Sequence, residues 1–170
     1  MKNISDISTV PAKLATPNDI GPKAKKAIAA ALNPLIADTF ALYVKTKNFH
    51  WHVSGSHYRD YHLLLDEQAT QIFAMIDVLA ERVRKLGGLT IRSIGHIKSL
   101  QHIKDDDSTF VKPRDMLKIL LDDNKLLESE MRHAHKICAE YNDVATTSVL
   151  EVYIDETERR IWFLYETSAE

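Results

Sequence analysis

The sequence predicts an all-α protein, a four-helix bundle with a short extra helix in the long connection between helices two and three. Two observations predict this class. Gly and Pro number only five each among 170 residues, too few for a turn-rich β sandwich. Apolar residues recur at three- and four-residue spacing in four long stretches, which is helical periodicity, and neither an alternating strand pattern nor an internal repeat is present. Four long helices joined in this way form a bundle.

The composition is that of an ordinary globular protein of one domain. Apolar residues make up 45% and charged residues 27%, and the net charge of −2 excludes a surface that attracts nucleic acid as a whole. The single cysteine excludes an internal disulfide and fits a reducing compartment. There is no run of 18 apolar residues and no apolar stretch typical of a secretory signal. We therefore expect a cytoplasmic protein without a membrane span.

The first residues read as a mobile N-terminal arm, residues 1–22, ahead of the bundle domain, residues 23–170. Three prolines and a glycine, with scattered Ser, Thr and Asn, punctuate this arm. Residues 1–26 carry five lysines against two aspartates. Two readings stay open, a solvated tail or a weak DNA-contacting arm whose phosphate attraction salt would screen. The DNA-contact candidates are Lys2, Lys13 and Lys23.

The first bundle helix is expected from Lys23 to Trp51, where apolar residues recur at helical spacing. Pro34 interrupts this stretch and predicts either a kink or a helix restart with Asn33 as cap. The segment "VSGS" ends the helix, and Ser56 is expected to cap the next one.

The second helix is expected to run to about Leu86 and to end at the pair Gly87-Gly88. Residues 89–111 form a long connection, in which the amphipathic stretch "IRSIGHIKSLQHI" predicts a short helix. Pro113 begins a third helix that ends near residue 141. A fourth helix follows at residues 144–167.

The second helix carries four residues that could bind a metal ion. At about 100° per residue, His62, Asp66, Asp77 and Glu81 share one side of the helix, and they form two i,i+4 pairs. The pairs cannot meet within one chain, because fifteen residues separate His62 from Asp77, roughly 22 Å along a helix. A metal–ligand bond of about 2 Å does not span that distance.

The positions of these four residues are symmetric about a point between residues 71 and 72. An antiparallel copy of the helix would place His62 opposite Glu81 of the partner subunit, and Asp66 opposite Asp77 of the partner subunit. His50 lies across a short turn and can join His62. A two-fold dimer would thus hold two identical sites. Imidazole and carboxylate ligands together suit iron, manganese or zinc, and several carboxylates suit two ions better than one.

A simpler interpretation exists for each residue taken singly. Asp66 and Asp77 are also plausible surface partners of nearby arginines, and His62 is also plausible as an ordinary histidine of the core or the surface. That interpretation does not explain the symmetric set.

At this point the chain resembles the Dps family, the DNA-binding proteins from starved cells or mini-ferritins. The resemblance rests on "KTKNFHWHVSG", on "HLLLDEQATQIFAMIDVLAERVRKLGG" and on "ERRIWFLYE", and it covers nearly the whole chain. The spacing H-x11-H-x3-D-x10-D-x3-E is similar to the family's intersubunit ferroxidase motif. The resemblance implies a ferritin-like bundle, a shell of twelve subunits, and oxidation of ferrous iron with hydrogen peroxide as preferred oxidant. It also implies storage of the ferric product and protection of DNA.

The resemblance implies a role for each ligand. His50 and His62 would be ligands, Asp66 and Glu81 would bind or bridge two irons, and Asp77 would bind directly or through water. Trp51, next to His50, would either quench stray oxidising equivalents or simply pack. No haem is expected, since no Met stands at an obvious haem-ligating position.

True ferritins and bacterioferritins differ from this pattern. They build the site inside one bundle, with Glu-x-x-His on two helices. This chain has that pattern once on its third helix, Glu130 to His133, and lacks it on the fourth.

Two functions remain after the sequence is read. The first is a peroxide-consuming ferroxidase and iron store, in a homo-oligomer of two-fold dimers that assembles to a dodecamer. Asp143 and Glu151, at the start of the fourth helix, are then candidates for an iron-conducting pore. The second is a DNA-compacting, nucleoid-associated structural protein whose metal site is secondary. The full ligand set favours the first function, and the few lysines of the arm count against the second.

Overall fold

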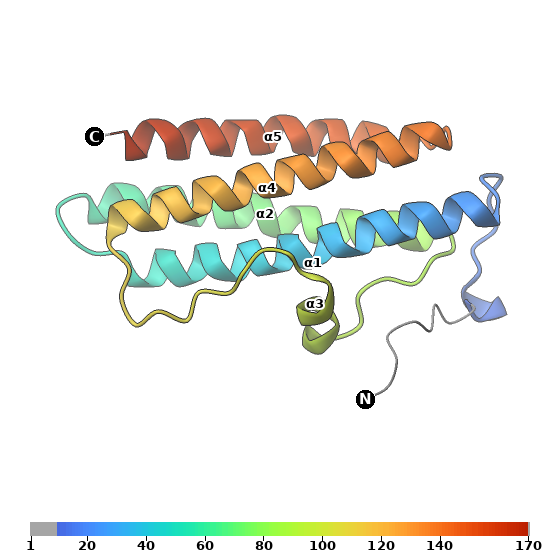
Figure 1. The fold of residues 1–170 in the computed structure, drawn as a ribbon, viewed down its shortest axis with the longest axis horizontal. Coiled ribbons are helices and arrows are strands. Elements are labelled where there is room, and N and C mark those ends of the chain that lie inside the picture. The colour runs from blue at the N-terminus through green and yellow to red at the C-terminus, as the bar shows by residue number, and fades with distance from the viewer. Residues whose placement is uncertain (1–9, 170) are drawn as a thin grey trace.

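Four long helices form an elongated bundle, and a fifth, short helix lies in the connection beside it (Figure 1). The computed structural model describes residues 10–169. Within this range every regular element is a helix, which confirms the predicted all-α, ferritin-like class. The elements are the 3-10 helix η1 (Ala12–Leu14) and the α-helices α1 (Pro22–His52), α2 (Tyr58–Lys85), α3 (Ile94–Leu100), α4 (Pro113–Glu140) and α5 (Val144–Ser168).

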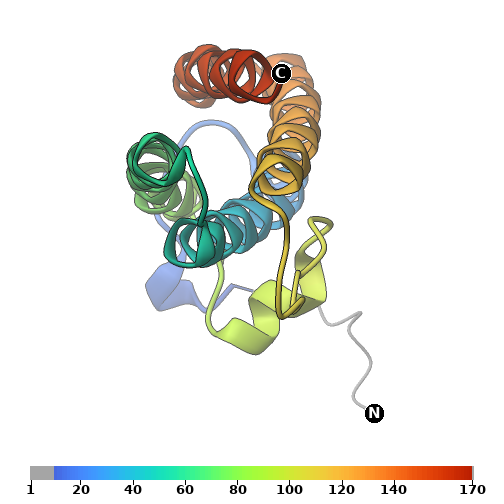
Figure 2. The same ribbon diagram turned by 90° about the vertical axis from the view of Figure 1, so that its left-hand side faces the viewer.

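The core lies along the bundle axis, where the apolar stripes of the four long helices meet (Figure 2). On α2 the stripe consists of Leu65, Ile72, Leu79 and Val83, spaced by four or seven residues and fully buried. Burying each such side chain stabilises the fold by about 1.5–3 kcal/mol. Helices α1 and α2 form one antiparallel hairpin and α4 and α5 another, so His50 at the end of α1 comes close to the start of α2.

Helix α1 is long and apolar enough to pass a composition test for a membrane span, with a mean hydropathy of 1.5 over 18 residues. Its apolar side chains, however, are used inside the bundle. Ile28, Leu32, Leu35, Ile36 and Leu42 are at most 1% exposed. The central helix of a bundle passes the same test because the bundle interior is apolar.

Pro34 does not divide α1, which is continuous from Pro22 to His52. The predicted alternative of a helix restart capped by Asn33 is therefore wrong. The side-chain amide of Asn33 instead donates to the carbonyl of Leu89, at 2.9 Å, and ties the helix to the start of the long connection. Asn33 therefore does not cap a helix; it bonds to a residue 56 positions later in the sequence.

The predicted cap of α2 is also wrong. The helix begins at Tyr58, and the residue before it, His57, makes no side-chain capping bond. Ser56 lies in the turn that precedes the helix. Gly55 adopts a φ of +99°, which favours glycine, and its carbonyl accepts from the amide of Tyr58 at 3.1 Å. This turn closes through the backbone, so no serine cap is required.

The described part of the N-terminal segment lies against the end of α2. Arg84 donates to the carbonyl of Leu14 at 2.9 Å, and Ile20 packs on the core. Gly87, with a φ of +79°, lies so close to Thr16 that an added Cβ would be 2.9 Å from the carbonyl oxygen of Thr16. Residues 10–21 thus contact the bundle, and the mobility predicted for the arm stays a prediction.

The connection that carries α3 is anchored by a buried carboxylate of α1. Asp38 is fully buried and accepts from the amides of His102 and Ile103, at 2.6 and 2.8 Å. The ring Nδ1 of His102 lies 3.0 Å from its other oxygen. Asp38 therefore fixes the point at which the connection turns back towards α4.

We expect Asp38→Ala to destabilise the protein, since the substitution leaves buried amides without an acceptor. The cost of an unsatisfied buried donor is roughly 1–3 kcal/mol. Urea unfolding of the metal-free protein measures it. The exposed Asp107, on the same connection, supplies the matched control as Asp107→Ala. Equal stability of the two variants would contradict the anchoring role.

Candidate metal centre

Two histidines meet where α1 and α2 join. His50 lies in the last turn of α1 and His62 near the start of α2, and their rings stack with centroids 3.8 Å apart and an interplanar angle of 23°. The Nδ1 atom of His50 lies 2.8 Å from the carbonyl oxygen of His62, and Nδ1 of His62 lies 2.9 Å from the carbonyl oxygen of His50. Each residue thus holds the ring of the other.

These two hydrogen bonds determine the tautomer of both rings. A carbonyl oxygen only accepts, so Nδ1 must carry the hydrogen in each histidine. In the neutral imidazole this leaves a lone pair on Nε2. A metal-binding histidine is typically held in this way, with its second nitrogen donating to a carbonyl or carboxylate. His50 and His62 are therefore both prepared to bind a metal through Nε2.

Asp66 follows one turn after His62, and its Oδ1 atom lies 3.8 Å from Nε2 of His50. The same oxygen accepts from the ammonium of Lys47 at 2.8 Å. This hydrogen bond and the charge of Lys47 lower the pKa of Asp66 below its ordinary value. The carboxylate is thus ionised at neutral pH, and an incoming cation meets the lysine as its competitor. Lys47 was missed in the sequence reading, although it stands one helical turn before His50.

Asp77 and Glu81 lie further along α2, and both are exposed. Glu81 pairs with Lys85 of the next turn, at 2.9 Å. Among residues 10–169, no three His, Cys, Asp or Glu side chains gather closely enough to hold a metal ion. One chain places His50, His62 and Asp66 near one another without forming a metal-binding cluster, and it leaves the other two predicted ligands further along α2.

Several large apolar side chains of α1 and α2 are exposed beside these charged residues. Trp51 is 64% exposed, and Val44, Leu63 and Phe73 are exposed as well. Phe73, near the midpoint of α2, packs against Tyr43 with ring centroids 5.0 Å apart. Exposed apolar side chains grouped on one face mark a surface for association.

The interior of the bundle does not offer a second metal site. The polar side chains buried around Arg160, where α2, α4 and α5 face one another, are Gln68, Asn124 and Thr157, and all three are neutral. The single Glu-x-x-His pattern does not reach this interior, because His133 is exposed and Glu130 half-buried. The bundle thus lacks, in its described part, the inward carboxylates of an intrasubunit di-iron site.

Asp143, one pore candidate, is 3% exposed and directed into the protein. Its carboxylate accepts from the amide of Thr146 at 3.1 Å, which caps α5, and from the guanidinium of Arg82 at 3.0 Å. This carboxylate holds α5 against α2, and the geometry does not support a pore role for it.

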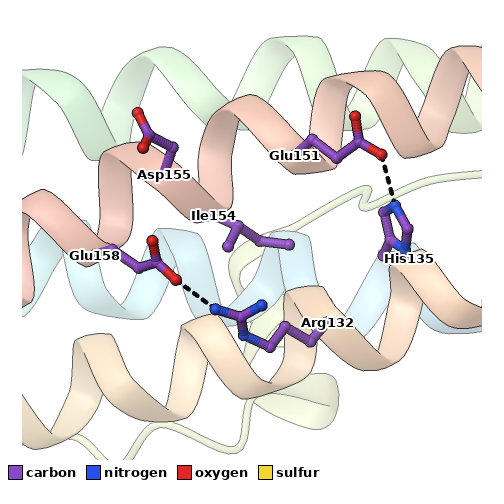
Figure 3. A pocket seen from close by; sticks show the side chains of 6 residues that line it. All are labelled: Arg132, His135, Glu151, Ile154, Asp155 and Glu158. Carbon is purple, nitrogen blue, oxygen red and sulfur yellow. Dashed lines mark hydrogen bonds and ion pairs between the residues drawn. The ribbon is translucent and has the colours of Figure 1, made fainter.

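Glu151, the other pore candidate, is exposed in a groove between α4 and α5 (Figure 3). One of its oxygens lies 2.9 Å from Nε2 of His135, and Arg132 pairs with Glu158 at the other end of the groove. Its pore role stays a prediction. Of the candidate DNA contacts, Lys13 and Lys23 are exposed, and Lys2 lies outside the described residues.

Comparison with known proteins agrees with this fold. Residues 29–169 match the ferritin-like domain family. The DNA protection during starvation protein of Brevibacillus brevis is 31% identical over 81% of this chain and 91% of its own. DpsC from Streptomyces coelicolor superposes with a TM-score of 0.88 at 28% identity, covering 98% of this chain and 95% of its own. A Vibrio cholerae O1 Dps protein, described as one of the ferritin-like diiron-carboxylate proteins, gives 0.82 at 28% identity, over 89% and 96% of the two chains.

The helical bundle and the family match thus define a protein of the ferritin-like class. Within that class, the chain belongs to the Dps family.

We expect His50 and His62 to carry their ring hydrogen on Nδ1 in the neutral, metal-free protein, because each Nδ1 donates to a carbonyl. Ring ¹⁵N chemical shifts above the imidazole pKa distinguish the two tautomers. His135 is an internal control, since its Nε2 faces a carboxylate and must carry the hydrogen itself. An Nε2–H tautomer at His50 or His62 would contradict the reciprocal arrangement.

Proposed function

We propose that this protein oxidises ferrous iron, its substrate, at a di-iron site shared between two subunits, preferably with hydrogen peroxide, and stores the ferric product. Each site takes His50, His62 and Asp66 from one chain, and Asp77 and Glu81 from its two-fold partner. The observation that carries the proposal is the pair of locked histidines, which present two Nε2 atoms beside Asp66 on an uncovered face.

The position of the remaining ligands supports a second chain as their source. Asp77 and Glu81 are exposed on the same helix, roughly 22 Å along its axis from His62. An antiparallel α2 with its two-fold axis between residues 71 and 72 would bring them to the histidines. Phe73 lies next to that axis, and the exposed apolar residues around it would be covered by the same contact.

The interior of the bundle supports the same location. A buried cation and no carboxylate occupy the place where intrasubunit di-iron sites are built. At the hairpin, by contrast, the Nε2 atom of His50 lies beside the exposed carboxylate of Asp66, and His62 stacks on His50.

The ligand types fit the chemistry. Two ferrous ions supply the two electrons that reduce one peroxide to water, so both oxygens are consumed and no hydroxyl radical is released. Carboxylates bind hard ions, and their negative charge favours the ferric product over the ferrous substrate. Imidazole nitrogens, neutral and held in place, select transition metals over calcium and magnesium.

Assembly and cellular role follow from the family. We propose that two-fold dimers form a dodecameric shell in the cytoplasm, with ferric iron inside. Removing ferrous iron and peroxide together protects DNA without contact to it. The DNA-compacting alternative is supported only by Lys13 and Lys23, which are exposed near the N-terminus, and by the names of DNA-protection relatives.

The direct test is the oxidation of ferrous iron loaded anaerobically onto the metal-free protein. We expect rapid oxidation on adding hydrogen peroxide, close to two irons per peroxide, and slower oxidation with oxygen. The double variant His50→Ala/His62→Ala should lower the rate at least about 100-fold, because second-sphere losses alone reach 10–100-fold. The control Asp60→Ala changes an exposed acid of the same helix. Oxidation no faster than in buffer would leave the family fold without the ferroxidase.

A shared site predicts complementation between two inactive variants. His62→Ala and Glu81→Ala should each be inactive alone, since each homodimer has two broken sites. Co-refolded heterodimers contain one site with both changes and one intact site, so about half of the wild-type rate per dimer should return. Mixing His62→Ala with Asp66→Ala is the matched control, because both changes lie in the same half-site, so each site of that heterodimer is broken and no activity should return. No recovery in verified His62→Ala/Glu81→Ala heterodimers would overturn the shared site.

A further inference from the structure

Arg160 is a buried cation that neither the core nor the metal centre explains. It lies in α5 and is 1% exposed. By residue volume it is among the largest fully buried side chains of the described residues. Its Nε atom donates to Oδ1 of Asn124 at 3.0 Å, and one terminal nitrogen lies near the Oγ1 of Thr157 and the sulfur of Met75. All of these neighbours are neutral.

The other terminal nitrogen, Nη1, is buried without a hydrogen-bond partner. Among residues 10–169, no carboxylate lies within ion-pair distance of this guanidinium. The nearest acidic influence is Glu156, one turn earlier on α5. Burial lowers the pKa of Arg160 to about 10, which still leaves it charged at neutral pH. A buried charge with an unpaired donor and no counter-charge lowers the free energy of unfolding. An anion bound to this donor would therefore stabilise the folded protein.

We infer that the bundle interior holds a small monovalent anion, of the halide class, on Nη1 of Arg160. A water molecule would accept the hydrogen bond from Nη1 but would leave the positive charge uncompensated. An anion would accept the hydrogen bond and also compensate the charge. One guanidinium supplies one positive charge, which matches a halide and not a divalent phosphate. Asn124 and Met75 pack on the guanidinium and favour a small ion.

This site is independent of the ferroxidase. Its residues belong to the interior, and the metal ligands belong to the face of the α1–α2 hairpin. Its effect is on stability, because an anion that binds only the folded chain shifts the folding equilibrium towards it. Once the site is saturated, each tenfold rise in anion concentration should raise the folding equilibrium constant about tenfold per site.

The test uses the intact metal-free protein with bromide as probe. Bromide replaces gluconate at constant ionic strength, and urea unfolding is followed at each concentration. We expect wild type to become more stable as bromide rises, and Arg160→Met to show no such dependence. Arg159→Met is the matched control, since Arg159 is exposed on the same helix over the ring of Phe163, and its removal should keep the bromide effect.

Crystals of the wild-type protein soaked in bromide decide the location, and they do so even if Arg160→Met fails to fold. An anomalous peak within hydrogen-bonding distance of Nη1, together with the stability effect, supports the site. A water at Nη1 without anomalous signal overturns it. So does Glu156 swung onto Arg160, or a bromide effect that Arg160→Met retains.

Discussion

A straight helix cannot bring its own two ends to one ion, and this constraint organises the whole functional surface. The rise of α2 keeps His62 and Asp66 apart from Asp77 and Glu81 by several turns. All four nevertheless lie on the outer side of the helix, among exposed apolar residues. In a monomer the two pairs of side chains cannot share an ion. In a two-fold dimer, each helix would contribute one pair to each of two identical sites.

The short turn between α1 and α2 determines which residues lie beside His62 and Asp66. Only residues 53–57 separate the two helices, so the last turn of α1 must lie beside the first turns of α2. The reciprocal bonds between His50 and His62 then join the helices and set the ligand tautomers at the same time. Under the proposed function, the two side chains that join the helices are also the metal ligands, so a substitution at either changes both roles.

The sequence predicted the helices well, because Pro, Gly and apolar periodicity act locally. Helix ends at Pro113 and near Gly87 agree with the structure to within two residues. The ligand set on α2 was inferred from helical periodicity, the symmetry of the positions and the family resemblance, and it stays a prediction. Features that depend on a distant partner were out of reach. Lys47 donates to Asp66 across the hairpin, Asn33 donates to the long connection, and Asp143, which caps α5, also accepts from Arg82 of α2.

The distribution of charge links assembly to chemistry. If the site is shared as proposed, a single subunit binds iron weakly at best, because each half-site lacks two of the five ligands. Under the proposed function, dimer formation and metal binding are then thermodynamically coupled: whatever factor the partner adds to the metal affinity, the metal adds to the dimer affinity. Lys47 softens this coupling, since its ammonium neutralises Asp66 while the site is empty. Two subunits could thus associate before iron binds, because Lys47 reduces the electrostatic repulsion between the carboxylates that would face each other across the two-fold axis.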